Sequence, residues 1–228
     1  MKLLQRTTFV FCIFAGWFGA VSVATAQATV DELVAICDGA YGGVFGTPNS
    51  EPLGPCQWDK ALINASDTGS YGLATGAGVK VGVIDGGVDM THPDIAPNLD
   101  VGLSCSFIFD HTPTADPGEI ANGDCSNKAA VQDLGGHGTH VASTIGAPIN
   151  GIGIAGVAPD VTLVALKACT VAGYCFADSV IYALYYAAHI GLDVVNLSLF
   201  ADPYLYYCKS EPEQKAILKE LEKAARYA

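Results

Sequence analysis

The stretch Val-Gly-Val-Ile-Asp-Gly-Gly-Val-Asp at 81–89 determines how this 228-residue sequence is expected to fold. Its β-branched residues predict a buried strand that ends at Asp85. A second stretch, Gly-His-Gly-Thr-His at 136–140, predicts that a loop enters a helix over 137–146. Together the two stretches place a carboxylate at the end of a strand and an imidazole at the start of a helix.

Strand and helix patterns alternate through the second half of the sequence. Apolar runs predict strands over 161–166 and 192–199, and apolar residues at helical spacing predict a helix over 176–188, which Gly191 ends. Ser210 and Glu213 have the spacing of a capping box, which predicts the start of a last helix. The residues of that helix expected to face inward are Ile217, Leu218, Leu221, Ala224 and Ala225.

This alternation predicts the fold class. Strands joined by helices form βαβ units, so we expect an α/β fold of three layers, with a mostly parallel sheet flanked by helices. Functional sites in such sheets lie at the carboxyl ends of the strands. Asp85 stands at one such end, and the segment after Leu199 reaches another.

The first 26 residues have the features of a secretory signal. Lys2 and Arg6 form a positive end, the run 9–23 is apolar, and Ala24-Thr25-Ala26 is a small-residue cleavage site. A membrane anchor is the competing interpretation, but the run is shorter than the roughly 20 residues that a span needs. We therefore expect a secreted or periplasmic protein that has no membrane attachment after cleavage.

Three segments follow from these patterns: the signal at 1–26, an N-terminal extension at 27–52 and the main domain at 53–228. Residues 27–50 are rich in glycine and weakly patterned, so we expect a loose structure there. Residues 95–134 are predicted to form a long surface excursion. The net charge of −12 becomes −14 once the two basic residues of the signal are removed, which argues against nucleic acid as a partner.

Seven cysteines lie beyond the signal, and in an exported chain they indicate disulfides. Proximity in the sequence favours Cys37–Cys56, Cys105–Cys125 and Cys169–Cys175, although the sequence alone allows other pairings. Cys208 is then left over. A zinc-type site is disfavoured because no Cys-x-x-Cys spacing is present.

Asp85 and His137 are residue types that acid–base catalysis uses. A buried carboxylate can hold an imidazole in one tautomer, and that imidazole can accept a proton from a hydroxyl. Five motifs in this order are similar to those of the subtilisin-like serine proteases. They are Val-Gly-Val-Ile-Asp-Gly-Gly-Val-Asp at 81–89, Thr-His-Pro-Asp at 91–94, Gly-His-Gly-Thr-His-Val-Ala at 136–142, Gly-Ile-Gly-Ile-Ala-Gly-Val-Ala-Pro at 151–159 and Asp-Val-Val-Asn-Leu-Ser-Leu at 193–199.

The resemblance runs from about Leu53 to Ala228 and implies a subtilisin-like fold, incomplete at the C-terminus, in a partial peptidase domain. It also implies roles for five residues, in a monomer that acts on protein or peptide substrates and requires no cofactor. Asp85 matches the orienting acid and His137 the general base. Gly173 matches the edge that pairs with an extended substrate backbone, while Ser198 and Leu199 match the opposite wall of the cleft.

Two further implications concern metals. Asp94 and Asn150 match positions at which family members place oxygen ligands for a structural calcium ion, which needs six to eight oxygens. The alternative for Asp94 is a carboxylate that caps a turn. His140 matches a structural histidine, and the alternative is a metal-binding His-x-x-His pair with His137.

The sequence also departs from the family pattern. Gly86 follows Asp85 where the family commonly has Thr or Ser, so a hydroxyl near the carboxylate is lost. Phe200-Ala201 replaces two glycines, and the large side chain is expected to narrow or reshape the primary specificity pocket. Residues 27–50 are too few for the folding pro-domain that many relatives carry.

The largest departure is the absence of two motifs: the nucleophilic Ser in Gly-Thr-Ser-Met-Ala and the oxyanion Asn in Ala-Gly-Asn. Ser198 belongs to a strand motif and is not the expected nucleophile. Without these groups acyl transfer loses its main rate contributions. We therefore interpret the sequence as a fragment of a serine endopeptidase, inactive by itself and with an exposed apolar sheet edge.

Two alternatives remain at this stage. The first is a short, catalytically inactive relative that binds peptides without cutting them. The second is an unrelated α/β hydrolase or nucleotide-binding protein, which is disfavoured because no Gly-x-Ser-x-Gly occurs and no Gly-x-Gly-x-x-Gly follows a strand.

Overall fold

The structure is a computed structural model and describes residues 29–110, 112, 118–121, 124–204 and 206–228. The predicted signal at 1–26 therefore lies outside the described residues. Within the part of the chain that is described, no helix is both long and apolar enough to cross a membrane.

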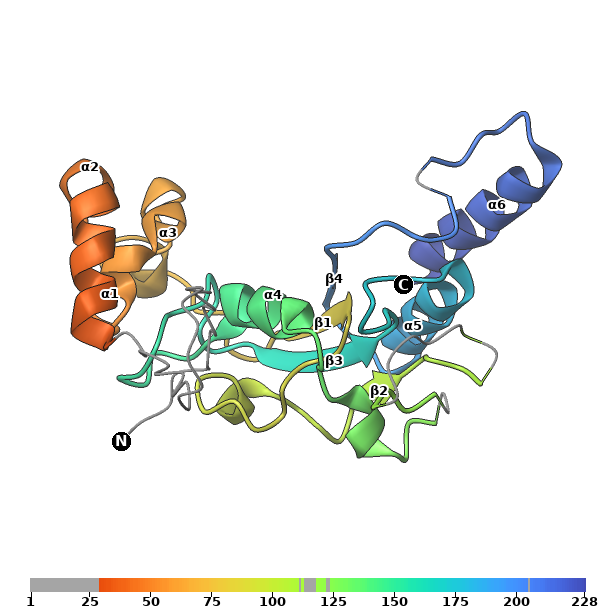
Figure 1. Cartoon of the computed structure of the whole chain (residues 1–228), viewed down its shortest axis with the longest axis horizontal. Coiled ribbons are helices and arrows are strands. Elements are labelled where there is room, and N and C mark those ends of the chain that lie inside the picture. Colours follow the sequence, from red (N-terminus) through yellow and green to blue (C-terminus); the bar gives the residue numbers. More distant parts are fainter. Residues whose placement is uncertain (1–28, 111, 113–117, 122–123, 205) are drawn as a thin grey trace, which may run out of the picture.

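A parallel sheet of four strands forms the centre of the molecule (Figure 1). The strand order is β2-β3-β1-β4, where β1 is Lys80–Asp85, β2 is Cys105–Ser106, β3 is Thr162–Lys167 and β4 is Val194–Leu197. All three strand pairs are parallel, which confirms the expected α/β class. Strand β4 is shorter than the predicted run of 192–199, and the two-residue strand β2 lies inside the segment that we predicted to be only a surface excursion.

Helices cover both faces of this sheet, as predicted. Helix α4 (His137–Gly146) packs on one face through Ala142, which joins a buried cluster with residues of β1 and β3. Helix α5 (Ala177–His189) covers the other face and packs with Ile84 of β1 and Leu166 of β3. Burying an isoleucine or leucine side chain such as Ile84 or Leu166 stabilises the fold by about 1.5–3 kcal/mol. The buried clusters on the two faces therefore hold the strands β1 and β3 in place.

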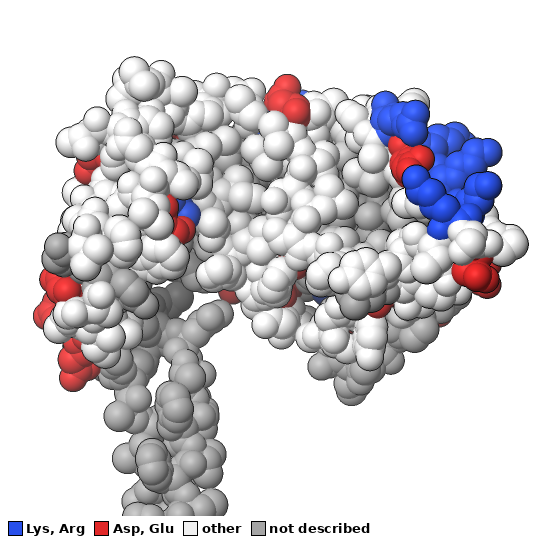
Figure 2. All heavy atoms as spheres, turned by 90° about the horizontal axis from the view of Figure 1, so that it is seen from above, with Lys and Arg blue, Asp and Glu red and all other residues white. Residues whose placement is uncertain are grey.

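Helix α6 (Pro212–Tyr227) packs against α5 and is amphipathic. Leu221 and Ala224 face the buried cluster under α5, whereas Ala225, which we predicted to face inward, is exposed. The outer face carries exposed basic residues at helical spacing, and they form the basic patch seen at one end of the molecule (Figure 2). These residues are Lys215, Lys219, Lys223 and Arg226.

The helix boundaries test the start and stop signals. Helix α4 begins and ends as predicted, and Gly191 follows α5 with φ of 67°, the left-handed conformation of a helix stop. The predicted capping box of α6 is wrong. The helix begins at Pro212, its N-cap is Glu211 without a side-chain hydrogen bond, and the Oε1 atom of Gln214 accepts from the Cys208 N–H. Proline suits the first turn because its missing N–H would have no partner there.

Residues 30–45 of the N-terminal extension are helical, so the prediction of a loose structure is wrong over this part of 27–50. Helix α1 (Val30–Cys37) begins with a capping box in which Thr29 and Glu32 satisfy each other's backbone N–H groups. Short helical segments follow: η1 (Asp38–Gly42), α2 (Gly43–Phe45), η2 (Gly54–Cys56), α3 (Trp58–Leu62) and η3 (Ser70–Gly72). Two others, η4 (Ala96–Asn98) and η5 (Lys128–Val131), lie in the excursion.

Three disulfides cross-link the chain, and their pairing is the one that proximity favoured. Cys37–Cys56 ties α1 to η2, Cys105–Cys125 closes the excursion onto β2, and Cys169–Cys175 closes the loop between β3 and α5. Cys208 is a free, exposed thiol.

Candidate active site

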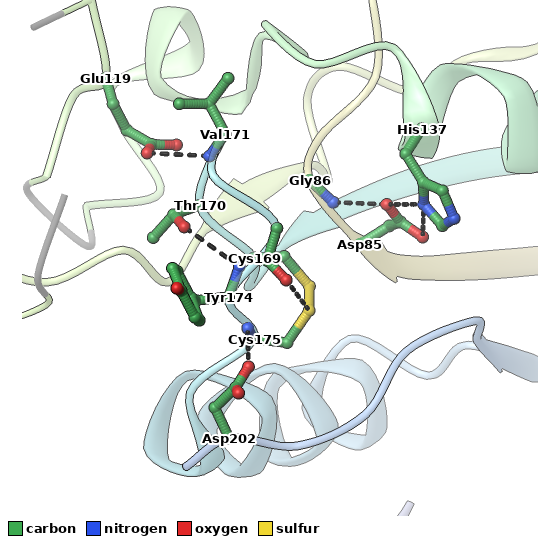
Figure 3. The surroundings of a disulfide bond; sticks show 11 residues. Asp85, Gly86, Glu119, His137, Cys169, Thr170, Val171, Tyr174, Cys175 and Asp202 are labelled. Atoms are coloured by element: carbon green, nitrogen blue, oxygen red, sulfur yellow. Dashed lines mark hydrogen bonds and ion pairs between the residues drawn. A yellow bond between two sulfur atoms is a disulfide. The ribbon is translucent and has the colours of Figure 1, made fainter. Parts of the chain in front are cut away.

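Asp85 and His137 meet at the carboxyl end of β1. Asp85 is buried, with 2% of its surface exposed, and both its carboxylate oxygens lie near His137 Nδ1, at 2.8 and 3.0 Å (Figure 3). An ionised carboxylate can only accept hydrogen bonds, so Nδ1 carries the proton and donates it. The ring is thereby held in the tautomer that leaves Nε2 unprotonated and able to act as a base.

The contact between Asp85 and His137 requires that the backbone of α4 at Gly138 pass close to the backbone at Gly87. A side chain at Gly138 would place its Cβ 2.1 Å from the Gly87 carbonyl oxygen and 3.0 Å from Asp85 Oδ1. Gly87 itself has φ of 99°, a conformation that L side chains rarely adopt. The Gly86 N–H donates to Asp85 Oδ1 at 2.7 Å, so a backbone donor supports the carboxylate at a position whose residue has no side-chain hydroxyl.

Asp133 fixes the start of α4 and was missed by the sequence analysis. Its Oδ1 accepts from the N–H groups of Gly135 and Gly136, and its Oδ2 accepts from the Thr139 N–H and hydroxyl. These bonds satisfy N–H groups at a helix start, which have no partner within the helix. The helix therefore begins at a defined position, and His137 is its first residue. The spacing of Asp133 and Thr139 across the helix start was the signal that could have identified it.

The Asp85–His137 pair opens onto a hollow of about 860 Å³. The structure brings Gly173, Ser198 and Leu199 to the lining of the same hollow, so all five residues predicted for the peptide-cleaving site gather there. The side chain of His137 is 66% exposed and is reachable by a ligand. The remaining lining includes aromatic residues from both sides: Tyr174, Phe200 and Tyr204.

One wall of the hollow is the loop closed by Cys169–Cys175. Within it, the Gly173 N–H donates to the Thr170 carbonyl at 2.9 Å, and Gly173 has φ of 87°. Gly173 therefore lies in a tight turn, and its own N–H is used within that turn. The opposite wall follows β4, where Phe200 is 68% exposed. Asp202 joins the two walls, because its Oδ2 accepts from the Cys175 N–H at 2.7 Å (Figure 3).

Asp94 and Asn150 lie together in a second polar site, with Glu51 as a partner that the sequence analysis missed. Asp94 Oδ2 accepts from the Ile154 N–H at 3.0 Å, and Glu51 Oε1 accepts from the Gly151 N–H at 3.2 Å. Both carboxylates are buried, and each has a second oxygen with no hydrogen-bond partner among the described residues. Burial, helped by the negative charge of Glu51, raises the pKa of Asp94 to about 6, against the lowering effect of the hydrogen bonds from Ile154 and Asn150.

His140 lies on the exposed side of α4. Its N–H continues the helix by donating to the Gly136 carbonyl, and its carbonyl accepts from the Ser143 hydroxyl. The roles that we predicted for His140, as for the residues of the hollow, stay predictions.

Comparison with known proteins supplies the family. The model of the subtilase family matches residues 76–219, which include Asp85, His137 and all four strands of the sheet. The chain belongs to the subtilase family. Subtilisin Savinase of Lederbergia lenta is 39% identical over 142 residues, which are 62% of this chain and 44% of that protein. The minor extracellular protease Vpr of Bacillus subtilis is 38% identical over 154 residues, 67% of this chain and 18% of Vpr.

Two solved structures share the fold of this chain. The nisin leader peptidase NisP of Lactococcus lactis superposes with a TM-score of 0.58 at 25% identity, over 75% of this chain and 46% of NisP. Fervidolysin of Fervidobacterium pennivorans gives a TM-score of 0.51 at 25% identity, over 76% of this chain and 24% of fervidolysin. This subtilase chain thus spans less than half the length of each relative named here.

Proposed function

We propose that this subtilase chain contributes the acid and base of a serine endopeptidase that hydrolyses peptide bonds in proteins. The observation that supports the proposal is the bond from His137 Nδ1 to the buried carboxylate of Asp85, at the rim of an open hollow. In the proposed reaction His137 Nε2 takes the proton of a serine hydroxyl. Asp85 stabilises the resulting imidazolium and keeps the ring oriented.

The nucleophile in this proposal comes from sequence outside the 228 residues. Ser198 does not fit the role, because it follows β4 and its hydroxyl accepts a hydrogen bond from Asn196 Nδ2 at 3.0 Å. The polypeptide of 228 residues is accordingly proposed to be inactive when made alone. Export to the extracellular space or periplasm is part of the proposal and is supported by the three disulfides, which persist in oxidising compartments.

The test is hydrolysis by the product of the complete reading frame that contains these residues. We expect it to cleave a peptide substrate and to be blocked by a serine-reactive phosphonate. His137→Ala should lower kcat by roughly a thousandfold or more, because the serine then has no base. His189→Ala, an exposed site at the end of α5, is the matched control.

Two results would contradict the proposal. One is full activity in His137→Ala, which would remove the role of the base. The other is a folded wild-type protein that binds peptides in the hollow but never cleaves them, which would favour an inactive peptide-binding relative instead.

We also propose that the site of Glu51, Asp94 and Asn150 holds a structural calcium ion. The two buried, unpaired carboxylate oxygens fit such an ion, because calcium prefers oxygen ligands and would neutralise two adjacent negative charges. The described residues contain no cluster of three or more His, Cys, Asp and Glu, so backbone carbonyls of the 150–154 loop would complete the ligand set. The ion's contribution is to stabilise the loop that precedes β3.

A further inference from the structure

Glu119 and Lys167 form a buried ion pair that the acid–base mechanism does not use. Their side chains are 0% and 1% exposed, and Lys167 Nζ lies 3.0 Å from Glu119 Oε1. Lys167 is the last residue of β3 and is paired in register with Asp85 on β1. Removing two charges from water is costly, so a pair in this place is weak evidence for stability alone and calls for another explanation.

The second oxygen of Glu119 reaches the wall of the hollow. Glu119 Oε2 accepts a hydrogen bond from the Val171 N–H at 3.0 Å, and Val171 lines the hollow (Figure 3). Lys167 is itself held in place, because its Nζ also donates to the Gln132 carbonyl at 3.0 Å. The carboxylate therefore joins the end of β3 to the loop between β3 and α5, and Glu119 itself is not among the residues that line the hollow.

Glu119 belongs to a segment that is distant in sequence from the loop that contains Val171. It belongs to the excursion that Cys105–Cys125 ties to β2, the strand next to β3. The Cys169–Cys175 disulfide closes the base of the loop that contains Val171, and the Gly173 N–H bonds to the Thr170 carbonyl within the loop. The bond from the Val171 N–H to Glu119 adds an anchor from outside the loop, and this bond is charge-assisted and partly buried.

We propose that Glu119 is a positioning residue for the edge formed by residues 171–173, along which an extended peptide binds. This inference rests on the proposed peptidase function and names a determinant of its substrate class. Lys167 holds the carboxylate, and the carboxylate holds the Val171 amide, so the edge is ordered before the peptide arrives and less ordering entropy is lost on binding. Peptides long enough to lie along the edge depend on Glu119, whereas short substrates that reach only His137 do not.

Two double variants separate positioning from folding. Lys167→Met/Glu119→Gln removes both charges but keeps a side-chain oxygen that can accept from the Val171 N–H. Lys167→Met/Glu119→Leu removes the same charges and that acceptor. Each variant replaces the whole ion pair, so neither leaves an unpaired buried charge, and thermal unfolding should give the two similar Tm values.

The measurements are hydrogen exchange at the Val171 amide and cleavage of two substrates by the product of the complete reading frame. We expect the Val171 amide to exchange at least about tenfold faster in the Leu variant than in the Gln variant. We also expect kcat/KM for a tetrapeptide anilide to be about tenfold lower in the Leu variant, while a single-residue ester is cleaved equally by both.

The control is Lys128→Met, which removes two lysine-to-carbonyl hydrogen bonds, to Gly102 and Ser104, at a place that does not line the hollow. It should leave the ratio of the two substrates unchanged even if the Tm falls. Equal Val171 exchange in the two double variants would overturn the proposal, and so would an equal loss on both substrates. If the wild type cleaves neither substrate, the proposed function fails, and the exchange at Val171 alone decides the role of Glu119.

Discussion

Asp133 takes no part in proton transfer, yet its carboxylate sets the position of the base. The four hydrogen bonds that it accepts hold the loop before α4 and the first turn of that helix, where His137 stands. At the scale of single residues, the geometry of the Asp85–His137 pair thus depends on a third carboxylate that never contacts the imidazole in the mechanism.

Asp133→Ala is expected to lower the free energy of unfolding by about 2 kcal/mol, because the N–H groups of Gly135, Gly136 and Thr139 lose a charged acceptor. It should also lower kcat/KM for peptides, since the start of α4 is no longer fixed. Urea denaturation and peptide cleavage measure the two effects. Asp133→Asn, which keeps one acceptor oxygen, should lie between the wild type and the Ala variant. An Ala variant as stable as the wild type would show that the cap is not needed.

The free energy of unfolding is expected to depend on pH because of Tyr71. Burial, followed by the negative charges of Asp67 and Asp59, raises the pKa of Tyr71 to about 12, and its hydroxyl donates to the Gly156 carbonyl at 2.7 Å. In the unfolded chain tyrosine has its ordinary pKa of about 10 and loses its proton first. Its contribution to stability is therefore complete below pH about 10 and is lost as the pH rises towards about 12.

Tyr71→Phe should be less stable than the wild type at pH 8, because it lacks the hydrogen bond. Above pH about 10 its Tm should fall less steeply than that of the wild type. Melting curves followed by circular dichroism between pH 8 and 11 measure the slope, with the exposed Tyr206→Phe as a control. Equal slopes for Tyr71→Phe and the wild type would contradict the assignment.

Single residues differ in how well the sequence predicts them. Asp85 and His137 are predictable because each lies in a dense local motif of glycines and small residues, whose spacing a strand end or helix start requires. Glu119 and Glu51 carry no such local signal. Their partners, Val171 and Gly151, lie 52 and 100 residues away in the chain, so only folding brings the groups together.

Among the structural elements, the 150–154 loop is the one whose stability we expect to depend on a metal. At a free calcium concentration about 100 times the Kd, a bound ion would stabilise the fold by about 2.7 kcal/mol. For a chain of this size, removal of the ion by a chelator should then lower the Tm by about 5–10 °C.

Scanning calorimetry with calcium and with chelator measures this difference. Asp94→Asn and Glu51→Gln should abolish the calcium dependence. Each is expected to raise the stability of the calcium-free protein, because each removes a buried negative charge without a counter-ion. A wild-type Tm that does not change with calcium would contradict the calcium proposal.

The ends of helices show which local signals are dependable. Helix α4 and the stop at Gly191 were predicted because a glycine or a helix-start motif acts on its immediate neighbours. The capping box expected at Ser210 and Glu213 did not form, because Pro212 suits the first turn and the helix starts there instead. The capping box of α1, between Thr29 and Glu32, was legible in the sequence, but the glycine content of 27–50 obscured it.

At the scale of the whole molecule, strand β4 lies at an edge of the sheet. Val194 and Leu197 are 51% and 42% exposed there, and an exposed apolar edge strand is a template for pairing with another chain. We expect the polypeptide of residues 27–228, made alone, to self-associate at concentrations of tens of micromolar.

Val194→Lys should shift this polypeptide towards the monomer, because a charge on the edge opposes strand pairing. Size-exclusion chromatography with light scattering measures the mass. The control is Leu73→Lys, which adds the same charge at a residue that is 89% exposed and lies off the sheet. Equal association in the two variants would locate the contact away from β4.

The sequence by itself determined the order of the elements β1, α4, β3, α5, β4 and α6, and it placed Asp85 at a strand end and His137 at a helix start. It favoured the three disulfides without excluding other pairings. These features depend on periodicity, on glycine motifs or on cysteines close together in the chain. Only the tertiary structure decided the strand order β2-β3-β1-β4, the helical extension, the support of His137 by Asp133 and the anchor from Glu119 to Val171. The physical reason is that buried polar contacts form between groups that meet only after the apolar faces have packed. Two such groups that are far apart in the chain carry no local sequence pattern that identifies them as partners.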